Sequence, residues 1–317
     1  MKLANFMSRK RATPGFTKSE PEVLIGAMDR HDDWAAVVCL VGGGQEINTG
    51  EAGISAWLDA IRTEFPHWEV HLSSKMSETE FGASKSIEAL TTGSNGNSRV
   101  TVDDSLHLTT SIRSFRTEHL SSFVREILDG DVEASRQLHQ KFEATYPVVV
   151  TRSMKAAREW VRGNRRGSQR AGLVASSSAQ RLKPHAVDIR VNVNPVHWFL
   201  NDARDTRSSQ YLEDAATEFQ VQGLEVDWAI VAWDADLRRD NGRWTYHSFR
   251  GARWTNVNNH ERRRYLLNAY RVLLTRARQG MVIFVPPGRR RDRTRSPAYY
   301  QGIYDYLLSV GVKPLPE

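Results

Sequence analysis

Three segments of the sequence combine residue types that suit the binding of phosphate groups. Residues 41–53 (VGGGQEINTGEAG) place a run of glycines directly before Gln45. Glycines allow a backbone to approach a ligand closely, and a glutamine side chain can orient a water molecule or a phosphate. A plain tight loop explains this segment equally well. The other two segments, residues 217–236 and 266–285, carry a more specific pattern.

In each of these two segments, a stretch with polar residues is followed by an apolar run. In the second segment, a turn at Gly223 is followed by Glu225 and then by a run typical of a buried strand. In the third segment, the end of a helical pattern presents Thr275, Arg276 and Arg278 before another apolar run. An arginine is always charged, and its planar guanidinium matches the geometry of phosphate oxygens.

The elements that would position these residues form an alternating pattern. Short apolar runs predict strands, and amphipathic stretches predict helices, so we expect an α/β fold with a mostly parallel sheet. Ligands of such sheets bind beyond the carboxyl ends of the strands, which draws attention to the loops after Val41, Trp233 and Val285. The predicted strands are residues 35–41, 68–72, 100–108, 147–151, 172–176, 226–233 and 281–285. The predicted helices are residues 19–30, 54–65, 121–128, 132–142, 154–161, 263–276 and 299–310.

The second and third segments resemble motifs V and VI of superfamily 1 helicases. The motif VI pattern is Tyr270 on a helix, followed by the sequence VLLTRA at residues 272–277. The motif V pattern is Thr217, followed by QGLE at residues 222–225. The three segments together are similar to one bacterial family of P-loop ATPases, the Schlafen-group-3-like DNA/RNA helicase domains. This resemblance extends over nearly all of residues 4–312.

The resemblance implies a RecA-like fold with an incomplete first lobe. Residues 1–65 would be a remnant of the first lobe, containing the motif III region. Residues 66–317 would be the whole second lobe, with motifs IV to VI. ATP and Mg²⁺ would be the cofactors, provided that a P-loop lobe completes the site.

The resemblance also implies roles for individual residues. Gln45 would sense the γ-phosphate, although the Gly-Asp that usually precedes it is Gly-Gly here. Arg113, within the motif IV-like sequence TTSIRS, would contact the nucleotide phosphates, and Gly223 and Glu225 would lie by the γ-phosphate and the ribose. Arg276 would be the arginine finger that stabilises charge on the transferred phosphoryl group. Alternatively, the two arginines are ordinary surface or ion-paired residues.

Two parts of an ATPase are missing from the sequence. No GxxxxGK[ST] loop occurs, and no Asp-Glu pair follows an apolar strand; Asp32-Asp33 precedes its predicted strand. In the family both parts lie upstream of the matched region. We therefore expect no ATP hydrolysis by this chain alone, and an exposed apolar surface at residues 35–41. Three situations would account for the incomplete first lobe. An upstream polypeptide could supply the P-loop, the gene could be truncated, or the second lobe could adopt the strand.

The distribution of charge suggests a polyanionic partner, either DNA or RNA. Residues 238–295 contain 16 Arg, no Lys and 3 acidic residues, within a chain whose net charge is +7. Such a concentration of basic residues is typical of surfaces that bind phosphate backbones, although an Arg-rich solvated surface would look the same.

A second basic segment, residues 152–170, could also follow a nucleic-acid backbone. It contributes Arg152, Arg165 and Arg166 as candidate contacts, and it is equally compatible with a solvated helix face. The motif V resemblance adds Thr217 and Gln222 as candidate nucleic-acid contacts.

Other chemistries receive less support from the sequence. His67 and His71 are four residues apart in an alternating pattern that predicts a strand, which does not suit a zinc site. Asp234 and Asp236 follow a buried strand, where carboxylates could bind metal in a nuclease. The single cysteine, Cys39, excludes an internal disulfide and a multi-cysteine zinc site.

The composition fits a globular protein, with 40% hydrophobic and 26% charged residues. Without a signal peptide or a membrane-length apolar run, the cytoplasm is the default location, and no membrane partner is expected. The expected function is the C-terminal part of a superfamily 1-type helicase ATPase, supplying an arginine finger and a nucleic-acid surface. The alternatives are a non-catalytic nucleic-acid-binding module or a metal-dependent nuclease.

Overall fold

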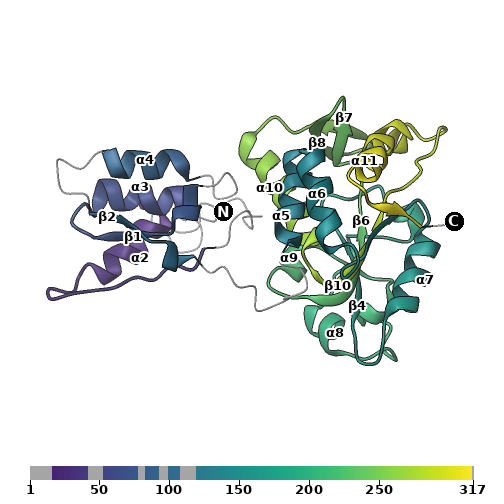
Figure 1. Ribbon diagram of the computed structural model, residues 1–317, viewed down its shortest axis with the longest axis horizontal. Helices are drawn as coiled ribbons and strands as arrows, with labels where there is room; N and C mark the ends of the chain where they lie inside the picture. The colour runs from purple at the N-terminus through teal and green to yellow at the C-terminus, as the bar shows by residue number, and fades with distance from the viewer. Residues whose placement is uncertain (1–15, 42–52, 78–82, 93–98, 108–118, 316–317) are drawn as a thin grey trace. The chain divides into compact units, whose positions relative to one another are not determined.

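The computed structural model describes residues 16–41, 53–77, 83–92, 99–107 and 119–315. The chain divides into two compact units, Met1–Thr110 and Ser111–Glu317, which are coloured purple to blue and teal to yellow in Figure 1. The predicted boundary between residues 65 and 66 lies inside the first unit. Among the described residues, no helix has the length and apolarity needed to cross a membrane.

The first unit is a small α/β assembly. Ser19 caps its helix at residues 20–28, with its hydroxyl accepting a hydrogen bond from the backbone N–H of Glu22. Two short parallel strands pack with the helices around Leu58, Val70 and Leu72. The helices are α2 (Glu20–Met28), α3 (Ile54–Glu64) and α4 (Ser84–Thr92), and the strands are β1 (Val70–Leu72) and β2 (Val100–Val102).

The predicted strand at residues 35–41 is wrong for this structure. These residues form no strand, and the side chains of Val38 and Leu40 are 86% and 83% exposed. An apolar run becomes a strand only where a neighbouring strand supplies hydrogen-bond partners, and none of the described residues does so here. The exposure of this apolar segment was expected, and the structure confirms it.

The second unit contains a six-stranded parallel sheet, which confirms the α/β prediction. The strand order is β11-β3-β10-β6-β4-β5. The strands are β3 (Val148–Thr151), β4 (Ala171–Ala175), β5 (Ala215–Ala216), β6 (Val226–Ala232), β10 (Ala277–Phe284) and β11 (Lys313–Pro314). We call the side of the sheet where the strands begin its amino edge and the opposite side its carboxyl edge.

Helices cover both faces of this sheet, which makes its central strands almost completely buried. Figure 1 shows α7 on one side, and α5, α6 and α10 on the other. Every residue of β4 and β6 is buried, as expected for continuous apolar runs in a parallel sheet. The helices of this unit are α5 (Leu120–Asp129), α6 (Val132–Phe142), α7 (Met154–Asn164), α8 (Pro195–Leu200), α9 (Glu218–Val221), α10 (His260–Leu274) and α11 (Ala298–Ser309).

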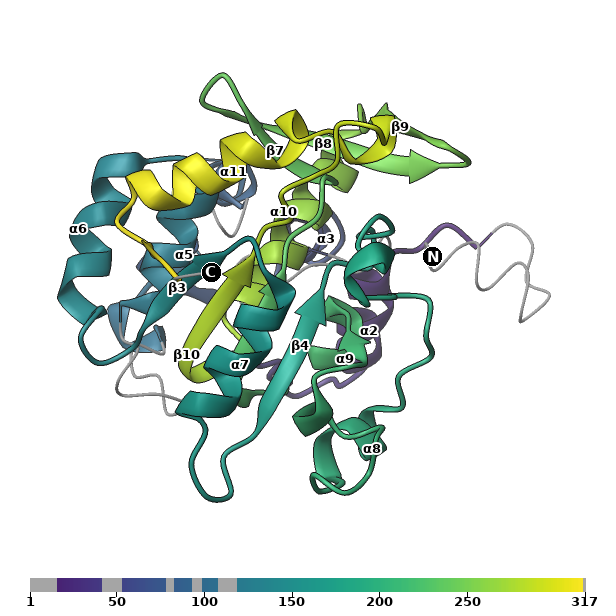
Figure 2. The same ribbon diagram turned by 90° about the vertical axis from the view of Figure 1, so that its right-hand side faces the viewer.

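A three-stranded antiparallel sheet follows β6, and the sequence analysis did not predict it. Its strands are β7 (Leu237–Asp240), β8 (Arg243–Arg250) and β9 (Arg253–Asn256), and it lies near α11 in Figure 2. The signal for the first turn was present, because Asn241-Gly242 is the preferred pair for a two-residue hairpin. Both residues adopt positive φ, at 47° and 74°.

Candidate functional site

Two of the candidate ATPase residues meet at the amino edge of the large sheet. Glu225 directly precedes β6, and Arg276 directly precedes β10, and these two strands are neighbours. Their first residues, Val226 and Ala277, pair in register, and the N–H of Val226 donates to the carbonyl oxygen of Arg276 at 3.0 Å. The fold therefore brings together two residues that are far apart in the sequence.

The guanidinium of Arg276 is buried against the turn that precedes β6. Its Nε donates to the carbonyl oxygen of Val272 at 3.0 Å, and its Nη2 donates to Oγ1 of Thr275 at 3.1 Å. Its Nη1 reaches the carbonyl oxygens of Val221 and Leu224 only at 3.4 and 3.5 Å. These last two distances lie beyond the usual range of N–H···O bonds, so the corresponding contacts are weak.

The turn after α9 places backbone at the surface of the same edge. Gly223 has a φ of +82°, which favours glycine, and an added Cβ would meet nothing within 4 Å. Gln222 and Leu224 on either side of it are exposed. Another group could therefore approach this turn without meeting side chains first.

The five candidate nucleic-acid contacts do not form one surface along the sheet. Thr217 follows β5 and Arg152 follows β3, so both lie at the carboxyl edge. Gln222, Arg165 and Arg166 precede strands and lie at the amino edge.

Two of these residues also have structural roles. Thr217 and Gln220 form a capping box at the start of α9. Arg152 donates to the carbonyl oxygen of Pro286 at 2.7 Å, and its guanidinium lies 4.0 Å from the ring centroid of Tyr304. The two remaining ATPase candidates, Gln45 and Arg113, lie outside the described residues.

Asp234 and Asp236 lie at the carboxyl edge, after β6, and both are completely buried. Asp236 accepts hydrogen bonds from the hydroxyls of Ser176 and Tyr270, at 2.7 and 2.5 Å. Asp234 accepts from the hydroxyl of Tyr300 at 3.0 Å, and neighbouring backbone N–H groups donate to both carboxylates.

These carboxylates therefore hold the fold together rather than facing a substrate. The nuclease alternative is corrected on this point, because its proposed ligands are turned inward and occupied. In the described parts of the chain, no group of three or more His, Cys, Asp or Glu side chains could hold a metal ion.

Burial has a measurable electrostatic consequence for this pair. Burial, together with the charge of Asp236, raises the pKa of Asp234 to about 7. Burial also raises the pKa of Asp236. The hydrogen bonds from Tyr270 and Tyr300 act in the opposite direction, because they favour the charged carboxylates.

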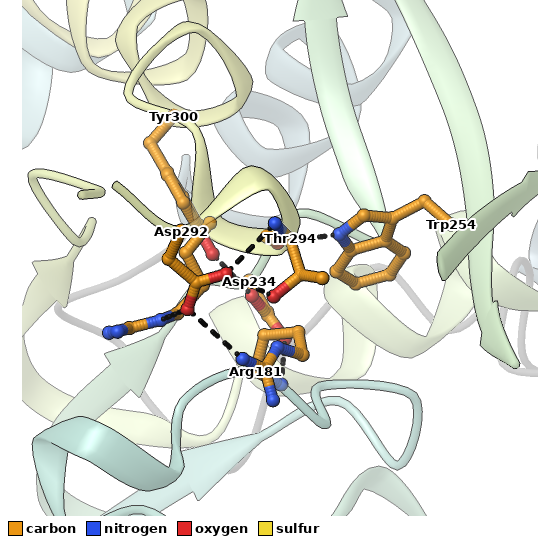
Figure 3. Close-up of polar contacts among 7 residues, drawn as sticks. Arg181, Asp234, Trp254, Asp292, Thr294 and Tyr300 are labelled. Carbon is orange, nitrogen blue, oxygen red and sulfur yellow. Dashed lines mark hydrogen bonds and ion pairs between the residues drawn. The ribbon is translucent and has the colours of Figure 1, made fainter. Parts of the chain in front are cut away.

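A polar network connects Asp234 to the antiparallel sheet, as Figure 3 shows. The backbone N–H of Arg181 donates to Asp234 at 2.8 Å, and the side chain of Arg181 pairs with Asp292 at 3.2 Å. Asp292 accepts from Thr294, whose carbonyl oxygen accepts from Nε1 of Trp254 on β9 at 2.8 Å. Sequence reasoning found Asp234 but missed its partners, which come from loops far away in the chain.

Comparison with known protein families identifies the family of the chain. No curated protein matches the sequence closely enough to count as a relative. The family model described as "Schlafen group 3, DNA/RNA helicase domain" matches residues 4–287, which is most of the chain. The chain therefore belongs to the Schlafen group 3 DNA/RNA helicase domain family, whose function is of the helicase type and related to nucleic acids.

Proposed function

We propose that this chain supplies the second-lobe half of a helicase-type ATPase that acts on DNA or RNA, with Arg276 as its arginine finger. The observation that carries this proposal is the adjacency of Arg276 and Glu225 at the amino ends of two neighbouring strands. Membership of the helicase domain family supports it. The exposed turn at Gly223 adds backbone that a nucleotide could approach.

The residues of the amino edge fit one side of a nucleotide. Arg276 offers a cation for phosphate oxygens, and Glu225 offers a carboxylate that could accept from ribose hydroxyls. The chain has no GxxxxGK[ST] loop and no Asp-Glu pair after an apolar run, and Asp234 and Asp236 are buried, so its residues do not fit the phosphate cradle or the Mg²⁺ site. We therefore assign the triphosphate and Mg²⁺ to a separate P-loop lobe.

The contacts of Arg276 suggest how it could act. Its Nη1 lies 3.4 and 3.5 Å from the carbonyl oxygens of Val221 and Leu224, so turning the guanidinium outward would break these long contacts together with the hydrogen bonds to Val272 and Thr275. Once turned outward, a permanently charged donor would stabilise the negative charge that develops during phosphoryl transfer.

The test compares two arginines that lie two positions apart. This chain is combined with a P-loop lobe from a longer family member, and ATP hydrolysis is measured with single-stranded DNA or RNA present. We expect Arg276→Lys to lower kcat by about 10²–10³-fold, because lysine lacks the planar fork. Arg278→Lys is the control, since the half-exposed Arg278 pairs with Asp227 and lysine keeps its positive charge, and it should change kcat by less than about twofold.

Equal activity of wild type and Arg276→Lys would overturn the finger assignment. The chain alone, without the P-loop lobe, should show no turnover above background. Hydrolysis by the purified chain alone would overturn the assignment of the triphosphate and Mg²⁺ to a separate P-loop lobe.

A non-catalytic nucleic-acid-binding module is the second candidate function. The concentration of arginine in residues 238–295 favours it, since this charge needs no nucleotide site to act. Under this alternative the chain binds single strands in a salt-dependent manner, and adding the P-loop lobe produces no turnover.

A further inference from the structure

A cavity of about 550 Å³ lies beside the antiparallel sheet, away from the amino edge where Arg276 sits. Three arginines contribute to its lining, Arg238 and Arg239 from β7 and Arg263 from α10. Its volume falls within the range of small-molecule binding pockets, and it is too large for a bare phosphate ion alone. The functions considered above leave this cavity without a role.

The lining carries positive charge that the protein does not neutralise. Asp240 is the single acidic residue among the lining residues, against three arginines. Within the described residues, none of the three guanidiniums forms an ion pair with a carboxylate. Each donates to a backbone carbonyl oxygen instead: Arg238 to Ala235 at 2.7 Å, Arg239 to Gly130 at 3.2 Å and Arg263 to Val257 at 2.6 Å.

Aromatic rings hold two of these guanidiniums in place. The guanidinium carbon of Arg238 lies 3.6 and 5.0 Å from the ring centroids of Tyr299 and Trp254. That of Arg239 lies 4.2 and 5.0 Å from the centroids of Tyr306 and Trp244. Side chains fixed in this way lose little conformational entropy when they bind an anion.

Packing between α11 and β7 sets this arrangement. A Cβ atom at Gly302 would come within 2.1 Å of the carbonyl oxygen of Arg239, so only a glycine allows the helix this close. Tyr299 and Tyr306 lie seven residues apart on α11 and therefore share one face of the helix. That face meets Arg238 and Arg239.

Several polar groups of the lining residues lack a partner within the described structure. Nη2 of Arg238 and Nε1 of Trp244 are buried donors without an acceptor. No hydrogen bond in the described residues involves the side-chain amide of Asn258, which is exposed and lines the cavity. His247 adds no charge at neutral pH, because burial, with a contribution from Arg238, lowers its pKa to about 4.

We propose that this cavity binds a nucleotide unit of a single-stranded nucleic acid, with Arg263 at its phosphate, Arg238 and Arg239 adding positive charge to the lining, and its base edge beside Asn258. Guanidiniums without a carboxylate partner favour the binding of an anion. The volume of the cavity can accommodate a ligand larger than phosphate. A side-chain amide next to the cations can bond to a base edge. The proposal deepens the nucleic-acid role proposed above, and it does not depend on Arg276 acting as a finger.

The first test measures binding of a fluorescently labelled oligonucleotide of roughly 12 residues, oligo(dT) or oligo(U), to the whole chain by fluorescence anisotropy. No nucleotide triphosphate is present, so the result is independent of the finger proposal. We expect Arg263→Gln to weaken binding about tenfold, because it removes a charge next to the phosphate. Arg262→Gln removes the same charge from an exposed neighbour outside the cavity, and it should weaken binding by less than about twofold.

A second pair of variants guards against loss of folding in Arg263→Gln. Asn258→Asp adds a negative charge at the cavity without removing a hydrogen bond, and it should weaken binding about tenfold. Asn241→Asp adds the same charge at the β7–β8 turn, outside the cavity, and it should have an effect below about twofold. Equal effects within each pair would overturn the proposal, since diffuse charge would then account for binding.

Competition identifies the source of the ligand. Unlabelled oligonucleotide should displace the probe, while a mononucleotide such as UMP should compete at least about 100-fold less well and inorganic phosphate less well still. If UMP competed as well as the oligonucleotide, the ligand would be a free nucleotide rather than a strand, and the proposal would be overturned. Displacement by a phosphopeptide as strong as that by the oligonucleotide would also contradict it.

Discussion

The amino and carboxyl edges of the six-stranded sheet are built in different ways. At the amino edge, the buried Arg276 donates to Val272 and Thr275 and makes two longer contacts, and the Gly223 turn is exposed. At the carboxyl edge, Asp234 and Asp236 are completely buried and accept hydrogen bonds from two tyrosines, a serine and the backbone. The amino edge combines a buried arginine with an exposed turn, whereas the carboxyl edge holds two buried carboxyl groups in a dense hydrogen-bond network.

This difference distinguishes a candidate functional residue, Arg276, from carboxyl groups that stabilise the fold. The finger proposal requires the guanidinium of Arg276 to leave its hydrogen bonds with Val272 and Thr275. The carboxyl edge is connected to the antiparallel sheet through the network of Asp234, Arg181 and Asp292. A perturbed carboxyl group in a buried network therefore indicates structure here, although perturbed groups often mark active sites.

The largest expected effect follows from removing Asp236. Asp236→Ala should lower the free energy of unfolding by about 3 kcal/mol, because the hydroxyls of Ser176 and Tyr270 would lose their buried acceptor. Gln222→Ala at the amino edge should change it by less than about 0.5 kcal/mol, because Gln222 is exposed. Urea unfolding measures both, and equal losses would break the comparison.

A pair of glycine substitutions probes packing near the two edges. Gly302→Ala should destabilise the protein by about 1–3 kcal/mol, because the new methyl group would collide with the carbonyl oxygen of Arg239. Gly163→Ala, in the last turn of α7, meets nothing within 4 Å and should stabilise by about 0.5–1 kcal/mol. Thermal melting of the two variants should therefore shift in opposite directions, and a shared direction would contradict the assigned packing.

The smallest effect concerns pH. The raised pKa of Asp234 means that the folded state holds a proton that the unfolded chain releases near its ordinary pKa. The resulting stability is present at low pH and is lost as the pH rises through about 7. We expect this group to account for a loss of about 1 kcal/mol between about pH 6 and 7 in urea unfolding. Asp234→Asn should flatten that slope, whatever its effect on stability at a single pH.

Much of the second unit could be predicted from the sequence. The apolar runs of β6 and β10 and the helical pattern of α10 have strong periodic signals, and all three elements occur as expected. The motif VI pattern located Arg276, and the motif V pattern located Glu225. The general preference for ligands at the carboxyl ends of strands would have pointed to the opposite edge from these two residues.

The remaining features depend on contacts that no local pattern records. Residues 35–41 have the composition of a buried strand. A strand also needs a neighbouring strand as its hydrogen-bonding partner, and a local sequence pattern does not show whether one is present. The partners of Asp234 come from separate loops, so spacing in the sequence could not reveal them. The first hairpin of the antiparallel sheet could have been predicted from the sequence, since Asn241-Gly242 is a preferred pair for its turn.

The order of strands in the large sheet has a consequence for synthesis on the ribosome. β3 is flanked only by β10 and β11, both of which lie near the end of the sequence. A newly made β3 must therefore wait, without a partner, until residues 277–284 have left the exit tunnel. Synthesis that stops before this point would release a chain with an unpaired apolar strand, prone to aggregate and dependent on chaperones.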